Sequence, residues 1–103
     1  MPSIPVGKRS SLPADSVMEV MIGEQPYAIC NSGGAITALN GICPHQGGPL
    51  GQGQLYEGLI VCPYHGWEFD CRTGECAIDP AKRVETYEVT IQGGDILLQV
   101  PDA

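Results

Sequence analysis

CPHQGGP at residues 43–49 and CPYHGW at residues 62–67 are the two stretches that decide what this chain folds around. Each stretch places a cysteine close to a histidine, so together they supply two thiolates and two imidazoles. Proline follows each cysteine, and glycines follow each histidine within two residues. Thiolate and imidazole are ligands for zinc, copper and iron–sulfur centres. The candidate ligands are Cys43, His45, Cys62 and His65.

Two alternatives to an iron–sulfur centre must be considered for these four residues. A zinc ion also takes two cysteines and two histidines, but zinc modules usually keep like ligands together, as C-x₂₋₄-C and H-x₃₋₅-H. Here each short motif mixes one cysteine with one histidine. The second alternative leaves the cysteines in the core and the histidines as ordinary surface residues. It is disfavoured because both histidines of the chain fall within the two motifs.

The two motifs and their surroundings, roughly Asn40 to Gly74, resemble the Rieske family, and within it the small soluble Rieske-type ferredoxins. Such a centre is a [2Fe–2S] cluster in which two histidines replace two cysteines on one iron. The resemblance implies one such cluster, with Cys43 and Cys62 on the buried iron. It places His45 and His65 on the outer iron, at the tip of the protein.

The rest of the chain predicts a single all-β domain, residues 1–103. Short β-prone runs alternate with turn residues, and no window favours a helix. The expected strands are 17–22, 26–30, 35–39, 55–61 interrupted at Gly58, 67–71, one long strand over 84–91, and 96–100. Residues 3–15 are expected to be an extended lead-in, and residues 31–34 a hairpin turn. This pattern predicts antiparallel sheets in a Rieske-like β sandwich or barrel. The family resemblance adds an inserted cluster-binding subdomain at about residues 41–78.

The net charge of the chain limits the classes of partner that it can bind. Five Lys/Arg against twelve Asp/Glu give a formal charge of −7, which argues against nucleic acid because phosphate binding needs cations. The acidity fits either a partner with a basic docking face or simple solubility, and both stay open. No apolar stretch approaches the roughly 18 residues of a membrane span. No secretory signal follows the first methionine, so we expect a cytoplasmic protein.

The residues around the motifs favour a low reduction potential. High-potential Rieske proteins join the two ligand loops by a disulfide, but the corresponding positions here are Gly48 and Tyr64. That branch also has a serine and a tyrosine after the second histidine, whose hydroxyls bond to cluster sulfurs. Trp67 and Phe69 stand at those places and lack hydroxyls. We expect a potential toward the low end of the approximate −150 to +300 mV Rieske range.

Three cysteines lie outside the motifs. Cys30, in an apolar run, is expected to be a buried small side chain. Cys71 and Cys76 flank a four-residue segment and would face each other across a hairpin, so a disulfide between them is left open. A reducing cytosol favours free thiols.

The resemblance implies a one-electron carrier without catalytic residues. Rieske oxygenases need two further histidines for a mononuclear iron, and this chain has none to spare. We expect a monomeric ferredoxin that passes electrons from a flavoprotein reductase to a terminal ring-hydroxylating oxygenase in aromatic hydrocarbon catabolism, with both partners docking near His45 and His65. One alternative is a small Rieske-like subunit of a nitrite reductase or another redox complex. Another is a metal-stabilised binding module without redox turnover.

Overall fold

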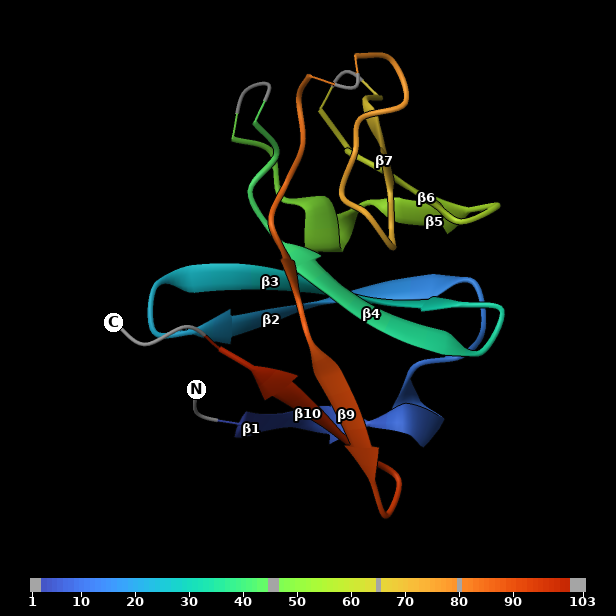
Figure 1. Ribbon diagram of the computed structural model, residues 1–103, viewed down its shortest axis with the longest axis vertical. Coiled ribbons are helices and arrows are strands. Elements are labelled where there is room, and N and C mark those ends of the chain that lie inside the picture. Colours follow the sequence, from blue (N-terminus) through green and yellow to red (C-terminus); the bar gives the residue numbers. More distant parts are fainter. Residues whose placement is uncertain (1–2, 45–46, 65, 80, 101–103) are drawn as a thin grey trace.

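The computed structural model describes residues 3–44, 47–64, 66–79 and 81–100 (Figure 1). Within these ranges the regular elements are strands and two short 3-10 helices, and all strand pairs are antiparallel, which confirms the all-β prediction. The strands are β1 (Ser3–Lys8), β2 (Ser16–Ile22), β3 (Gln25–Ser32), β4 (Ala35–Asn40), β5 (Gln54–Tyr56), β6 (Leu59–Val61), β7 (Glu68–Asp70), β8 (Thr86–Tyr87), β9 (Val89–Gln92) and β10 (Asp95–Gln99). The helices are η1 (Arg9–Ser11) and η2 (Leu50–Gln52). Neither of them has the length to cross a membrane.

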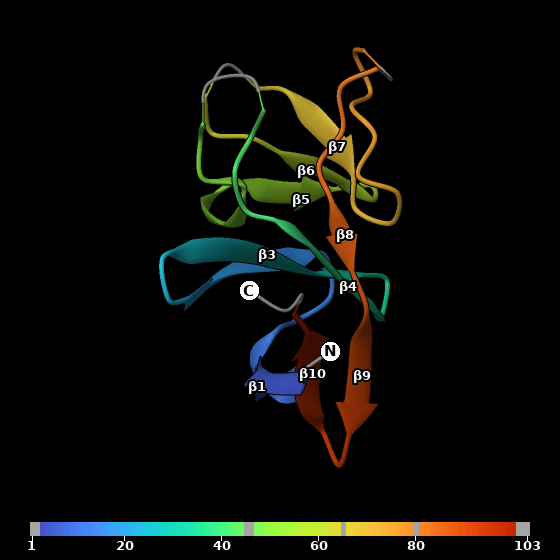
Figure 2. The same cartoon turned by 60° about the vertical axis from the view of Figure 1, so that its left-hand side comes forward.

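Three sheets are stacked along the long axis of the molecule (Figures 1 and 2). The lower sheet has the strand order β1-β10-β9, the middle sheet β2-β3-β4-β8 and the upper sheet β5-β6-β7. The loops that carry the two motifs lie at the upper end, beyond the middle sheet. The lower and middle sheets therefore form the base on which the motif loops stand.

Strand β3 is the centre of the fold because both of its faces are covered. Five consecutive residues, 27–31, are buried, whereas a strand with one solvent-exposed face would alternate buried and exposed residues. Tyr27 and Ile29 pack downward in a core with Ile96 and Leu98 of β10. Ala28 and Cys30 pack upward, in a second core shared with the upper sheet. One strand thus holds the base and the motif end together.

The second core lies directly beneath the motif loops. It combines Leu39 of the middle sheet with Ile60 and Phe69 of the upper sheet and Leu50 of η2, all fully buried. Each such side chain contributes about 1.5–3 kcal/mol when it leaves water. All five cysteines of the chain lie in this core. The two motif loops therefore pack on a buried apolar core.

The hairpin predicted at residues 31–34 is confirmed as the β3–β4 connection. Gly33 and Gly34 have φ values of +59° and +97°, which glycine adopts without steric cost. The Asn31 side chain accepts a hydrogen bond from the Gly34 N–H at 2.8 Å and donates one to the Leu12 carbonyl at 2.7 Å. Since the turn fixes the register, it also determines where β4 ends and the first motif loop begins.

Two strand predictions were wrong. Residues 3–8 were expected to be only an extended lead-in, but they form β1 and pair with β10, so that Ile4 stands opposite Leu98. The single long strand predicted over 84–91 is divided at Glu88 into β8 and β9. It divides because β8 pairs with β4 in the middle sheet and β9 pairs with β10 in the lower sheet. The chain changes sheets there, and alternation in the sequence does not reveal that.

Candidate metal centre

The first motif loop is closed by its own backbone. The Cys43 N–H donates to the Gly48 carbonyl at 2.9 Å, and the Gly47 N–H donates to the Cys43 carbonyl at 2.8 Å. An antiparallel bridge between Ile42 and Pro49 closes the loop below. Cys43 is only 1% exposed, so this loop turns its thiol inward. Its predicted ligand His45 lies outside the described residues, as does Gln46.

The second motif loop connects β6 to β7 and has a similar closure. The Cys62 N–H donates to the Trp67 carbonyl at 2.8 Å, across the neck of the loop. The Tyr64 N–H approaches the Cys62 sulfur at 3.4 Å. Backbone N–H groups that point at a ligand sulfur stabilise its negative charge. Cys62 is buried, and His65, the fourth predicted ligand, lies outside the described residues.

The structure brings Cys43 and Cys62, the two cysteines predicted as ligands, together from separate loops. Burial raises the pKa of the Cys62 thiol, the Tyr64 N–H opposes this rise, and the adjacent Cys43 thiol adds to it. Ionisation of two adjacent buried thiols is unfavourable, because burial and a neighbouring negative charge both disfavour the thiolate. A bound metal removes that penalty because it neutralises the thiolates it binds. Two paired, buried sulfurs therefore fit a thiolate-bound iron.

Gly48 presses its backbone against this pair. A Cβ placed on Gly48 would lie 2.8 Å from the Cys62 sulfur and 3.1 Å from the Tyr64 Cβ. Only glycine leaves that space to the sulfur. Positions 48 and 64, which carry the disulfide in high-potential Rieske proteins, are thus direct neighbours here.

The glycines that the sequence marked as loop residues divide into two classes. Gly47 and Gly66 have φ values of +72° and +69°, with nothing within 4 Å of an added Cβ. Gly48 and Gly51 have ordinary φ values but no room, since a Cβ on Gly51 would lie 2.6 Å from the Cβ of Glu19. The first class provides the turns, and the second permits close packing of Gly48 against the Cys62 sulfur and of Gly51 against Glu19 of β2.

Trp67 and Phe69 take up different positions below the second loop. Phe69 is fully buried in the second core, and Trp67 is partly buried against the same core. Neither side chain brings a hydroxyl to the surroundings of Cys62. The predicted low potential itself stays a prediction.

The three remaining cysteines are free thiols. Burial raises the pKa of Cys30 to about 12, with the nearby Cys71 adding to the rise and Thr37 opposing it, so this thiol is protonated and inert at neutral pH. Cys30 is therefore the buried small side chain that was predicted. The residue opposite Cys76 is Phe69 rather than Cys71. The facing arrangement suggested for Cys71 and Cys76 was wrong, because the Asp70 N–H bonds to the Glu75 carbonyl at 2.8 Å and Cys71 therefore lies in the turn.

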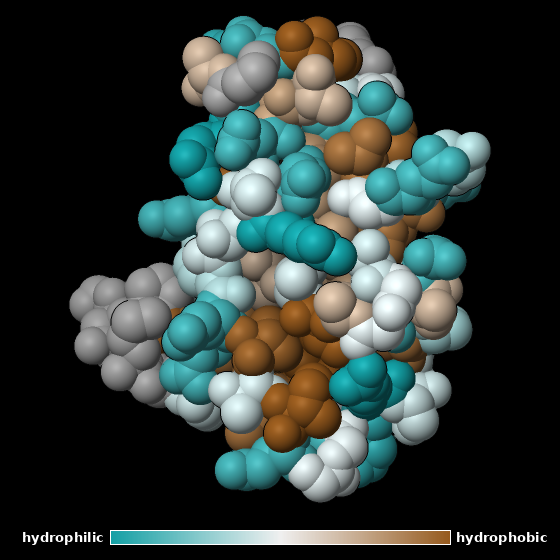
Figure 3. Space-filling view, turned by 45° about the vertical axis from the view of Figure 1, so that its right-hand side comes forward, coloured by the Kyte–Doolittle hydropathy of each residue, from teal (hydrophilic) through white to brown (hydrophobic). Residues whose placement is uncertain are grey.

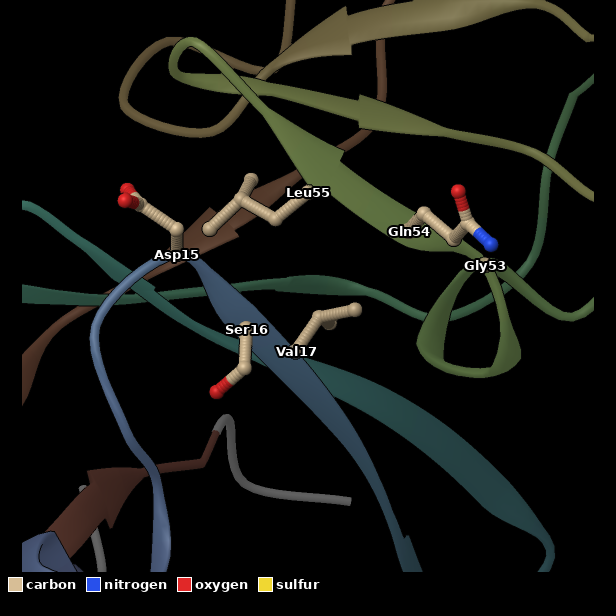
Figure 4. Close-up of a pocket in the computed structure, with 6 residues that line it drawn as sticks. All are labelled: Asp15, Ser16, Val17, Gly53, Gln54 and Leu55. Atoms are coloured by element: carbon tan, nitrogen blue, oxygen red, sulfur yellow. The ribbon is translucent and has the colours of Figure 1, made fainter.

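Two surface hollows are lined by residues outside the two motif loops. One, of about 370 Å³, opens between β2 and β5 and is lined by Asp15, Ser16, Val17, Gly53, Gln54 and Leu55 (Figure 4). It has a single carboxylate. A second, of about 320 Å³, lies beside β7. In the described ranges no group of three or more Cys, His, Asp or Glu side chains gathers as a metal site, and two of the four predicted ligands fall outside those ranges.

Comparison with protein families gives a match to the Rieske [2Fe-2S] domain over residues 3–88. Among curated proteins, the ferredoxin component of the alkene monooxygenase system of Xanthobacter autotrophicus is 33% identical over 87 residues, 82% of this chain and 70% of that protein. The 3-phenylpropionate/cinnamic acid dioxygenase ferredoxin subunit of Escherichia coli is 36% identical over 78 residues, 74% of each chain. The vanillate O-demethylase oxygenase subunit of Pseudomonas sp. is 43% identical over 56 residues, 54% of this chain but only 17% of that subunit.

Solved structures agree over nearly the whole chain. The Sphingomonas yanoikuyae B1 ferredoxin superposes with a TM-score of 0.87 at 25% identity, covering 97% of this chain and all of that one. A chain from the complex of reduced oxygenase and oxidized ferredoxin in carbazole 1,9a-dioxygenase gives a TM-score of 0.85 at 26% identity, with 93% and 91% covered.

Proposed function

From the premise that the chain belongs to the Rieske [2Fe-2S] domain family, we propose that it is the ferredoxin component of a multicomponent ring-hydroxylating oxygenase system. It takes single electrons from a flavoprotein reductase and passes them to the terminal oxygenase. The observation that carries this proposal is that one Rieske domain spans residues 3–88 of a 103-residue chain. Two relatives that this chain matches over 70% and 74% of their own length are ferredoxin components.

The proposed ligands are Cys43, His45, Cys62 and His65, within a cluster-binding subdomain at about residues 41–78. The protein holds one Rieske cluster, which supplies reversible uptake of a single electron. The described residues support the cysteine half of this ligand set, since two separate loops bring both thiols into one buried place. Loop backbone and apolar core exclude water from the sulfurs, which protects a thiolate-bound centre from exchange.

Partners are proposed to dock at the motif end, near His45 and His65. Between Glu24 and Glu68 the sequence has one charged residue, Glu57, and both motif loops lie within that span. Apolar side chains are visible at this end of the surface (Figure 3), and Tyr64 of the second loop is 48% exposed. We therefore propose a small contact made by uncharged loop residues at the tip, which suits a short-lived complex.

The negative charge acts at longer range. Residues outside 25–67 carry all but one of the acidic side chains behind the net charge of −7. A basic partner surface is attracted to that field, and salt slows association because it screens the attraction. We propose a monomeric, cytoplasmic carrier that meets reductase and oxygenase in turn.

A spectrum of the purified protein is the first test. Reduction by one electron should bleach a red-brown chromophore and produce a Rieske EPR signal, with two irons and two sulfides per chain. A colourless, zinc-containing protein contradicts the proposal.

Turnover is the second test. In an assay that combines a flavoprotein reductase with a ring-hydroxylating oxygenase, substrate hydroxylation should depend on added carrier. Gln46→Glu should reduce turnover at limiting carrier while the visible spectrum stays unchanged. Full turnover by this variant, together with a rate that salt does not alter, contradicts docking at the tip.

A further inference from the structure

Asn40 is the last residue of β4, three positions before Cys43. Its side-chain oxygen accepts two hydrogen bonds, from the Ile42 N–H at 2.9 Å and from Gln25 Nε2 at 3.2 Å. Its own N–H donates to the Glu85 carbonyl at 2.8 Å. The side chain of Asn40 thus connects the first turn of the motif loop to β3, and its backbone N–H connects it to the segment before β8.

The residue after Asn40 is held as firmly. The Gly41 N–H donates to the Pro26 carbonyl at 3.0 Å, and a Cβ on Gly41 would lie 2.9 Å from the Pro26 carbonyl carbon. The Gly41 carbonyl accepts from the Leu50 N–H at 2.9 Å, where the loop returns. Hydrogen bonds therefore hold both ends of the loop at the place where β4 ends and β3 begins.

This attachment matters because the loops of the two proposed ligand cysteines start from different sheets. Cys43 continues from β4 of the middle sheet, whereas Cys62 directly follows β6 of the upper sheet. Figures 1 and 2 show the first loop rising past the upper sheet to reach the same end of the molecule. The distance between the two sulfurs therefore depends on where the first loop leaves the middle sheet.

We propose that Asn40 is a positioning residue for the metal centre: its amide oxygen fixes the start of the first loop and so sets where Cys43 stands relative to Cys62. The inference rests on the proposed function, since it takes both cysteines as ligands. Asn40 touches neither sulfur in any described contact and acts through the loop backbone. Gln25 supports it from the side by holding the amide in one orientation.

Variants of Asn40 test this in the holo-protein. Asn40→Ala removes the acceptor, and release of iron to a strong chelator should become about fivefold faster, the factor for one net hydrogen bond of about 1 kcal/mol. The EPR signal of the reduced protein should broaden, because Cys43 then samples several positions. Asn40→Ser keeps an acceptor for the Ile42 N–H without adding charge, so it should restore the narrow signal. Gln25→Ala should fall between the wild type and Asn40→Ala.

Asn31→Ala is the matched control. Asn31 also makes two side-chain hydrogen bonds next to a β3 turn, but they go to Leu12 and Gly34 in the base. This variant should lower the melting temperature and leave the EPR line shape and release rate unchanged. The inference is overturned if Asn40→Ala keeps the wild-type signal and release rate, if Asn40→Ser is no better than Asn40→Ala, or if Asn31→Ala changes the signal equally. A wild-type protein without any Rieske signal instead contradicts the proposed function.

Discussion

Replacing Gly48 by alanine adds one methyl group at the most crowded point of the metal centre. The φ of Gly48 is not in the left-handed region, so the backbone itself accepts alanine. The new Cβ, however, would lie 2.8 Å from the Cys62 sulfur and 2.9 Å from the Tyr64 Cγ. Carbon atoms in contact prefer about 3.5–4.0 Å, and sulfur is larger. The sulfur or the loop must therefore move by roughly 0.7–1 Å.

That movement exceeds what a metal site accepts. Ligand distances are held within about 0.2 Å, so Cys62 cannot bind as before unless the first loop gives way. Inserting a methyl group into a packed interior costs about 1–3 kcal/mol. If all of this cost falls on cluster binding, the affinity drops by a factor of roughly 5–150. Gly48→Ala should therefore be purified with much less iron and sulfide than the wild type.

Iron, sulfide and EPR measurements on protein made under identical conditions provide the assay. Gly47→Ala is the control, because position 47 has open space but a φ of +72°. It should lose about 1–2 kcal/mol of folding stability through backbone strain and keep its cluster. Gly48→Ala with Tyr64→Ala relieves the contact with the ring but leaves the one with the sulfur, so the deficit should persist. Full iron content and an unchanged EPR signal in Gly48→Ala would refute the reasoning.

Three further predictions address tuning, stability and pH. Trp67→Ser combined with Phe69→Tyr should raise the potential by supplying hydroxyl donors to the cluster sulfurs, and voltammetry that shows no rise with the cluster intact contradicts this. Cluster removal should lower the melting temperature clearly, because ligand binding contributes folding free energy, and calorimetry of holo- and apo-protein checks it. Burial and the Glu85 carboxylate raise the pKa of Tyr87 from the ordinary 10 to about 12. The unfolded chain then loses its proton first, so stability should fall between pH 10 and 12. Melting curves of Tyr87→Phe should show a smaller fall there, and an equal fall in both proteins rejects this role.

Local chemistry explains which structural predictions succeeded. The β3–β4 hairpin follows from Gly33 and Gly34, whose φ values are available to glycine whatever the rest of the chain does. The burial of Cys30 follows from a short apolar run. The predictions that failed depend on residues far away in the sequence. Strand β1 forms because it pairs with β10, and the break at Glu88 exists because β8 pairs with the middle sheet and β9 with the lower sheet.

For this protein, the sequence by itself determined the candidate ligands: the types, order and loop spacing of Cys43, His45, Cys62 and His65, and the lack of hydroxyls at Trp67 and Phe69. Side-chain chemistry and short-range turn geometry are properties of neighbouring residues, so they can be read along the chain. Tertiary structure alone decided that the loops of Cys43 and Cys62 leave from different sheets, that Gly48 packs against the Cys62 sulfur, and that Asn40 bonds to the start of the first loop. These features arise because buried residues far apart in the sequence share one core, and close packing there permits a single arrangement.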